Sequence, residues 1–294
     1  MANIHLSEAE KVFILHGIRE NLRCDGRKRS DYRPMEIETD IVLNSNGSAR
    51  LRLANSDVMA SIKAEIDQPH ASRPNEGKVE FFVDCSANAT PEFEGRGGEE
   101  LALEISNTMS KAFSSPNTFD LKTLCILPRT YCWKLYIDIL ILECGGNLFD
   151  AVSIAVKAAL FDTKIPNVTP VELDKGNTEL VLSDDIYDCS RLDVTKVPLL
   201  VTLCKVGDDC IIDPTAEEEE CKIASLVVGV CCQSETEATI ATIRTSGTGS
   251  ISQETLSKQL KMSLNGALCV NKLLMETLKR CEELPEDHTV GFLK

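Results

Sequence analysis

The segment ECGGNLFD has the composition of an anion-binding turn. An apolar stretch typical of a strand precedes it, and an apolar stretch typical of a helix follows it. Gly145 and Gly146 allow a tight turn, after which the first N–H groups of a helix would point toward a phosphate. Asn147 and Leu148 stand where Ser, Thr, Lys or Arg would complete such a site, and Asp150 adds a carboxylate. We therefore expect the backbone of a phosphate site without its side chains.

The composition excludes several classes of protein. A chain of 294 residues has room for one large or two medium domains. It has no run of eighteen apolar residues and no basic, then apolar, N-terminal stretch, so we expect neither a membrane span nor a secretory signal. The 13 cysteines form no CxxC pair and predict reduced thiols. The 4 histidines lie far from one another and from cysteines at metal spacing, so no metal site or cofactor is predicted.

The net charge of −15 argues against a free-standing nucleic-acid binder. The same charge is compatible with a subunit of a nucleic-acid-binding complex in which other subunits supply the positive charge. Two segments depart from the average: RCDGRKRSDYR, residues 23–33, is basic, and DPTAEEEECK, residues 213–222, is acidic. Each is either solvated surface or a contact for a partner, and the sequence leaves both interpretations open.

The first half of the chain reads as strands followed by helices. Ser7 and Glu10 form a capping-box pattern at the start of a first helix. Period-two alternation then predicts strands near residues 35–43, 49–54, 58–66 and 78–87, with a hairpin turn at Asn46-Gly47. A helix is expected over residues 99–113, a strand over 133–142 and a second helix over 149–160.

The second half repeats this plan after a polar connection. Strands are expected near residues 199–206, 223–232 and 238–245, followed by a helix over 252–284. We predict an N-terminal helix and basic segment (1–30), a first half (31–165), a linker (166–197) and a second half with the C-terminal helix (198–294). The order indicates an α+β fold of mixed and antiparallel sheets, with helices packed on one side.

Three longer segments together carry a family resemblance. They are LRCDGRKRSDYRPMEIETD, PNEGKVEFFVDCSANATPEFEGRGGEELA and YIDILILECGGNLFDAVSIAVKAAL. In this order they resemble the RNase PH family and, more narrowly, the RNase PH-like ring subunits of the eukaryotic RNA exosome. The resemblance implies an RNase PH-like fold of two related halves and a hexameric ring of related chains. It also implies RNA-binding cap subunits on that ring and RNA threaded toward a separate 3′→5′ nuclease.

The resemblance also implies what the Gly-Gly turn has lost. Active members follow the turn with a hydroxyl residue and an arginine that hold inorganic phosphate, whereas this chain has Asn147 and Leu148. The two aspartates that active members carry further on match Glu219 and Ser225. A leucine cannot form the bidentate bonds of a guanidinium, and losing one such contact costs about a hundredfold to a thousandfold in rate. Gly145 and Gly146 are thus interpreted as a remnant cradle in a chain without catalytic or metal-binding residues.

The resemblance further implies that a non-catalytic subunit lends basic residues to the RNA path. Arg96, Lys111 and Lys122 are the candidates, although surface solubility explains each of them equally well. The expected role is structural support of RNA processing and degradation, including ribosomal RNA maturation, in the nucleus, the nucleolus and the cytoplasm.

Two other functions stay open on the sequence. An active phosphate-dependent 3′→5′ exoribonuclease would require a different match for Asn147, Leu148 and Ser225. A metabolic enzyme of unrelated activity would require a pocket with convergent titratable groups, and the sequence shows no such set.

Overall fold

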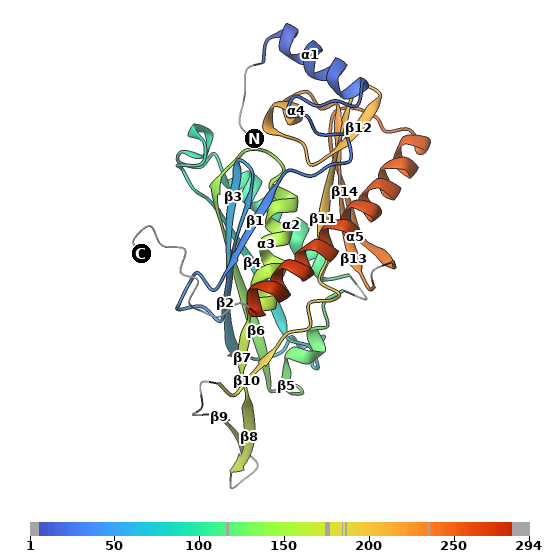
Figure 1. The fold of residues 1–294 in the computed structure, drawn as a ribbon. Coiled ribbons are helices and arrows are strands. Elements are labelled where there is room, and N and C mark those ends of the chain that lie inside the picture. Colours follow the sequence, from blue (N-terminus) through green and yellow to red (C-terminus); the bar gives the residue numbers. More distant parts are fainter. Residues whose placement is uncertain are drawn as a thin grey trace.

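The computed structural model describes residues 6–115, 118–173, 177–183, 185, 187–234 and 236–283. The chain folds into two sheets with helices between them (Figure 1). The expected α+β class is confirmed.

The first sheet is formed by the N-terminal half and has the strand order β1-β2-β3-β6-β4, with β5 pairing to β6. All its pairs are antiparallel except β4 with β6, so the sheet is mixed. Alternation places Leu51, Ala60 and Ile137 in the core, with polar side chains on the opposite face. The strands are β1 (Met35–Thr39), β2 (Gly47–Leu53), β3 (Ser56–Asp67), β4 (Lys78–Cys85), β5 (Cys125–Leu127) and β6 (Tyr131–Glu143).

The second sheet is antiparallel throughout, with the order β12-β11-β13-β14. Every residue of β13 is buried, because helices cover both faces of this sheet. The strands are β11 (Leu199–Val206), β12 (Asp209–Ile212), β13 (Ala224–Cys232) and β14 (Ala238–Gly247).

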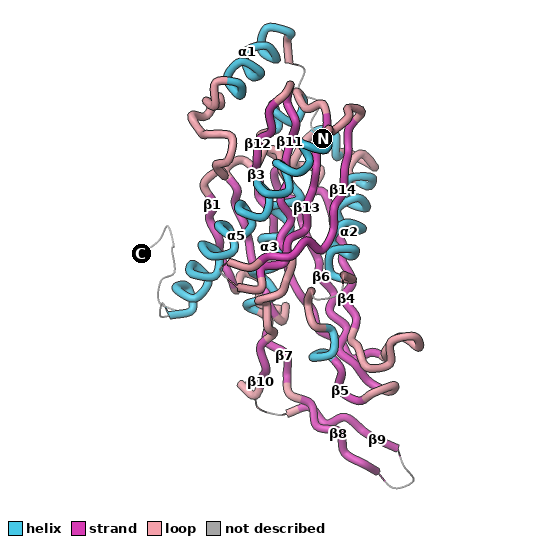
Figure 2. Tube along the Cα trace, turned by 90° about the vertical axis from the view of Figure 1, so that its right-hand side faces the viewer, coloured by secondary structure: helices cyan, strands magenta, loops and turns pink. Residues whose placement is uncertain are grey.

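The helices divide the molecule into layers. α2 (Glu99–Phe113) and α3 (Leu148–Asp162) lie between the sheets, and α3 is buried on all sides from Leu148 to Leu160. The long α5 (Gln253–Glu283) packs on the other face of the second sheet and reaches α3 with its C-terminal half (Figures 1 and 2). The first sheet therefore carries its helices on one face, as expected, while the second lies between two helical layers. α1 (Glu8–Arg19), α4 (Ala216–Glu220) and the short 3-10 turns η1 (Pro91–Phe93) and η2 (Leu121–Leu124) complete the fold.

The predicted start of the first helix is confirmed. The capping box at α1 is present, with the Ser7 and Glu10 side chains bonded to each other's backbone N–H groups. The predicted hairpin is present, because β1 and β2 are antiparallel, but its connection is residues 40–46 and Gly47 is already the first residue of β2. A Cβ on Gly47 would lie 2.6 Å from the Thr163 backbone, so this glycine permits a close approach of two segments.

The predicted linker contains paired strands. β7 (Lys164–Pro166) pairs with β10 (Cys189–Arg191), and β8 (Val168–Leu173) pairs with β9 (Asn177–Leu182). The β8–β9 ribbon projects from the body of the molecule (Figures 1 and 2). The segment is therefore not an irregular connection, although the domain limits themselves stay a prediction. None of the helices in the described part of the chain combines the length and the apolarity that a membrane crossing requires.

Candidate functional site

The Gly-Gly turn joins β6 to α3 in a left-handed conformation. Gly146 has φ 95° and Asn147 has φ 55°, so two successive residues turn the chain before α3 begins at Leu148. A Cβ on Gly146 would lie 2.5 Å from the Ala216 nitrogen. The Ala216 N–H also donates to the Gly145 carbonyl at 3.1 Å. The segment before α4 is therefore packed directly against the turn.

The anion-binding donor of the turn is already occupied. The Asn147 backbone N–H donates to Oε1 of Glu219 at 3.0 Å. This carboxylate lies where a helix N-terminus would bind a phosphate oxygen. Burial raises the pKa of Glu219, and the nearby Lys222 charge and the Asn147 N–H oppose that shift. The cradle that was expected to be open is thus closed by a side chain of the same molecule.

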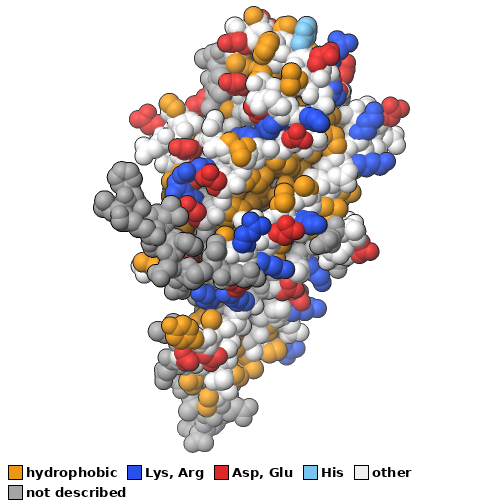
Figure 3. Space-filling view, viewed as in Figure 1, with side chains coloured by type: hydrophobic (Ala, Val, Ile, Leu, Met, Phe, Trp, Pro, Cys, Tyr) orange, Lys and Arg blue, Asp and Glu red, His pale blue; other side chains and the backbone are white. Residues whose placement is uncertain are grey.

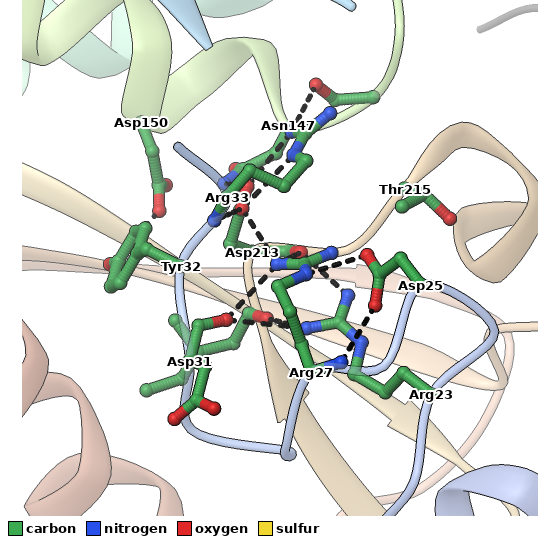
Figure 4. A network of polar contacts seen from close by, with 12 residues as sticks. Arg23, Asp25, Arg27, Asp31, Tyr32, Arg33, Asn147, Asp150, Asp213 and Thr215 are labelled. Atoms are coloured by element: carbon green, nitrogen blue, oxygen red, sulfur yellow. Dashed lines mark hydrogen bonds and ion pairs between the residues drawn. The ribbon is translucent and has the colours of Figure 1, made fainter. Parts of the chain in front are cut away.

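A second carboxylate, that of Asp213, binds the side chains of Asn147 and Arg33 next to the turn. Asp213 is fully buried. Its carboxylate accepts a hydrogen bond from Nδ2 of Asn147 at 2.6 Å and another from Nη2 of Arg33 at 2.8 Å (Figure 4). Arg33 also donates to the carbonyls of Gly145 and Gly146, at 2.9 and 3.0 Å. Burial by itself would raise the pKa of Asp213, but hydrogen bonds and charge from Arg33, with the Asn147 amide, hold that pKa below its usual value.

The basic and acidic segments of the sequence bind each other. Arg23 pairs with Glu218 and donates to the Ile212 carbonyl at 2.9 Å, and its guanidinium is buried. Arg27 pairs with Asp213 at 3.0 Å (Figure 4). Both open interpretations, solvated surface and partner contact, are therefore wrong for Arg23, Arg27 and Arg33. The sequence analysis missed these residues as part of the site, and the opposite charges of the two segments were the signal that could have indicated it.

Asp150 differs from the fixed negative charge that was expected. It is fully buried at the start of α3, and the Tyr32 hydroxyl donates to its Oδ2 at 3.3 Å. Burial raises the pKa of Asp150 to about 7. The negative charge of this carboxyl is therefore less favoured than that of an exposed aspartate.

The remaining predicted site residues lie in different surroundings. Leu148 is 6% exposed and belongs to the main hydrophobic core. Ser225 is buried in β13, and its hydroxyl lies 2.7 Å from the Ser246 hydroxyl on the neighbouring strand. The structure brings together Gly145, Gly146, Asn147 and Glu219, whereas the contact found for Ser225 is within its own sheet.

A cavity of about 770 Å³ opens beside the turn. Arg27 and Arg33 line it, and Nη2 of Arg27 is buried there without a hydrogen-bond partner. Carboxylates also line it, and these are Asp25, Glu143, Glu217 and Glu218. A phosphate dianion entering this cavity would meet several negative charges, while Nη2 of Arg27 is inaccessible in this conformation.

A second, more apolar hollow lies between the chain before β1 and α5. It has a volume of about 710 Å³ and is lined mainly by aliphatic side chains, among them Met35, Ile37, Val270 and Leu274. Figure 3 shows apolar side chains around a hollow on this face. Of the titratable residues that line it, Arg33 pairs with Asp213 and Tyr32 donates to Asp150, so they are not the free convergent groups that a metabolic enzyme would require.

The RNA candidates do not form one patch. Arg96 is 91% exposed in its side chain and pairs with Glu99 at 3.7 Å, at the start of α2. Lys111 lies in the last turn of α2, so the length of that helix places it roughly 20 Å from Arg96. Lys122 is exposed in η2 and lines a separate cavity of about 580 Å³ with Arg73 and Lys196.

The part of the chain that the structure describes contains no group of His, Cys, Asp or Glu residues arranged to hold a metal ion. The contacts found at the Gly-Gly turn are made by arginines, carboxylates, the Asn147 amide and backbone groups of this chain.

The sequence and the fold match one family of known proteins. Models of the 3′ exoribonuclease family, RNase PH, match residues 31–166 with domain 1 and residues 196–266 with domain 2. A Dictyostelium discoideum protein, provisionally named exosome complex exonuclease RRP42, is 31% identical over 93% of this chain and 98% of its own length. The exosome complex component Rrp42 of Methanopyrus kandleri is 32% identical over 76% of this chain and 82% of its own length.

Solved structures agree with this assignment. A chain of the Archaeoglobus fulgidus exosome with RNA bound to the active site has a TM-score of 0.74 and 25% identity, covering 92% of this chain and 98% of that chain. Rice Rrp46 shares the fold, with a TM-score of 0.62 and 16% identity over 87% of this chain and all of that chain. With both domain models and full-length relatives matched, the chain belongs to the RNase PH 3′ exoribonuclease family.

Proposed function

We propose that this chain is a non-catalytic ring subunit of an RNA exosome. The relatives named as exosome components, and the likeness to a chain of an exosome core, support its place in such a ring. The observation that carries the non-catalytic part is the hydrogen bond from the Asn147 N–H to the Glu219 carboxylate.

The chemistry of phosphorolysis explains why the hydrogen bond between Asn147 and Glu219 argues against catalysis. The reaction brings a phosphate dianion against a phosphodiester, so the enzyme must supply donors and positive charge to both. Here the donor at the turn faces Glu219, and Leu148 packs in the core where active relatives hold phosphate with an arginine. Arg33 could supply charge, but Asp213 and two backbone carbonyls engage its guanidinium.

In this role the chain supports RNA processing and degradation rather than cutting RNA. Its partners are other RNase PH-like ring subunits, RNA-binding cap subunits and RNA passing through the ring. Arg96, Lys111 and Lys122 are the proposed RNA contacts, and nucleus, nucleolus and cytoplasm are the proposed locations.

The competing function is an active phosphate-dependent exoribonuclease. The feature that favours it is Arg27, which lines the same cavity as Gly145 and whose buried Nη2 has no hydrogen-bond partner among the described residues. The surrounding carboxylates oppose it, because they repel both the attacking phosphate and the RNA backbone.

We expect the purified chain to leave single-stranded RNA at full length, with or without phosphate and Mg²⁺. The reason is that Glu219 engages the Asn147 N–H and Asp213 engages the Asn147 amide, so carboxylates lie at the turn where the attacking phosphate would bind. The measurement is the length of 5′-labelled RNA together with the release of nucleoside diphosphates. Phosphate-dependent release that Arg27→Gln abolishes, in a variant with unchanged circular dichroism, would contradict the proposal.

We expect the isolated chain to self-associate and to become monodisperse when co-expressed with a related ring subunit. β14 is the outer strand of its sheet, and its side chains Ile240 and Ile243 are 38% and 48% exposed. Such an edge pairs readily with another chain, and a closed ring covers it. Size-exclusion chromatography with light scattering measures this. A stable monomer that ignores the related subunit would count against the ring.

A further inference from the structure

The outer face of the first sheet carries apolar side chains where solvent-facing positions are usually polar. Phe82 of β4 is 51% exposed, and Met59 of β3 and Leu140 of β6 are partly exposed on neighbouring strands. These three side chains line a cavity of about 370 Å³ on that face. The same cavity is lined by the polar side chains Ser61, Asp84 and Asp138.

At two neighbouring paired positions of β4 and β6, here called rungs, an aromatic residue lies opposite a carboxylate. In the first rung Glu80 lies opposite Tyr136, and the Lys134 side chain contacts both of them. The Lys134 Nζ is 2.9 Å from Glu80 and 4.5 Å from the centroid of the Tyr136 ring. This rung therefore contains an aromatic ring, a carboxylate and a cation that satisfies both.

The second rung contains the ring and the carboxylate only. Phe82 lies opposite Asp138, and its ring stacks on Tyr136 at 6.1 Å between centroids. Asp84 follows two positions further along β4. Within the described residues, neither the Asp84 nor the Asp138 carboxylate has an ion pair or a hydrogen bond. The second rung thus repeats the first without a cation bonded to its carboxylate. Lys63 of β3, opposite Tyr136, pairs instead with Glu65 at 2.9 Å.

We propose that this pocket receives an arginine side chain from a basic segment of a partner protein. The apolar part of the arginine packs against Met59 and Leu140, and the guanidinium lies on the exposed Phe82 ring. Its planar fork can donate to carboxylates on two sides, which a compact ammonium group does less well. The net charge of −15 also favours approach of a basic segment.

Other occupants fit this pocket less well. RNA carries phosphates, which Asp84 and Asp138 repel. A metal ion prefers several oxygen ligands that converge, and no such group occurs among the described residues. The pocket shares no residue with the Gly-Gly turn or with the exposed edge of β14, so its variants leave both of those features unchanged.

The methyl group of Met59 reports on this pocket directly. With ¹³C-methyl-methionine labelling of the full chain in its co-expressed assembly, the probe is a short peptide containing one arginine between glycines. We expect a saturable shift of the Met59 signal, identified by its loss in Met59→Leu. A peptide with citrulline in place of arginine is the matched neutral control and should bind at least about tenfold more weakly.

Variants separate the pocket from general charge attraction. The double variant Asp84→Asn with Asp138→Asn should weaken arginine-peptide binding by at least about tenfold, while Glu36→Gln with Glu38→Gln, on β1 of the same sheet and outside the pocket, should leave it unchanged. Equal shifts with the citrulline peptide, no shift, or an equal shift in the double variant would overturn the proposal. Displacement of the peptide by Mg²⁺ or Ca²⁺ at equal concentration, or a comparable shift with single-stranded RNA, would overturn it as well.

Discussion

Replacing Asp213 with asparagine is expected to lower the free energy of unfolding by about 3–5 kcal/mol, because it leaves the buried Arg33 guanidinium without its carboxylate, whereas Arg27 keeps Asp25 at 2.6 Å. The Arg33 side chain is 5% exposed and the Arg27 side chain 11% exposed, and both pair with Asp213. Asparagine keeps the shape of the side chain but cannot neutralise these charges. The measurement is denaturant unfolding followed by fluorescence of Trp133, the only tryptophan in the chain.

The matched control is Asp209→Asn. Asp209 also pairs with an arginine of the basic segment, Arg29, but both side chains are about one-third exposed. Such a pair contributes about 0–1 kcal/mol. All variants are compared at one protein concentration, so that self-association contributes equally. Similar losses for Asp209→Asn and Asp213→Asn would show that the buried arrangement adds nothing.

The contribution of Asp213 also has a defined pH dependence. Because its pKa in the folded chain is lower than the ordinary value of 3.8, the unfolded chain binds more protons at acidic pH. The stabilisation is fully present above the ordinary pKa and is lost as the pH falls through the lowered one. In Asp213→Asn this part of the acid sensitivity should disappear.

Replacing Lys157 with methionine is expected to raise the free energy of unfolding by about 2 kcal/mol at pH 7. Lys157 is fully buried in α3, and its Nζ donates to the Val197 carbonyl at 3.1 Å. Burial lowers its pKa from 10.5 to about 8, which corresponds to a cost of about 3 kcal/mol. Losing the hydrogen bond to Val197 offsets about 1 kcal/mol of the gain, and an unbranched methionine fits the same space.

The pH profile distinguishes this effect from a change in packing. Since the unfolded chain binds more protons between pH 8 and 10.5, the parent protein should gain stability as the pH rises through this window. Below pH 8 the cost is present in full. Lys157→Met should remove this rise, while Lys261→Met, at an exposed position of α5, should keep it. A variant that is no more stable than the parent at pH 7, with the rise intact, would contradict the assignment of a buried charge.

Signals that depend on near neighbours determined much of the fold. The capping box placed the start of α1, and the apolar spacing placed α2 at Glu99–Phe113, because both depend on contacts within a few residues. The β8–β9 ribbon was missed, since Pro166 and Pro170 interrupt the alternation there and only strand pairing reveals it. Gly47 was taken for a turn residue, because its close neighbour Thr163 is distant in sequence.

The site divides in the same way. The sequence by itself determined that the Gly-Gly turn lacks a phosphate-binding hydroxyl and arginine, because residue identity at Asn147 and Leu148 decides which bonds are possible. Only the tertiary structure decided that Glu219 accepts the Asn147 N–H and that Arg33 and Arg27 pair with Asp213. These contacts join segments separated by 72 to 186 residues. Their partners are chosen by how the two sheets pack around α3, which no local pattern encodes.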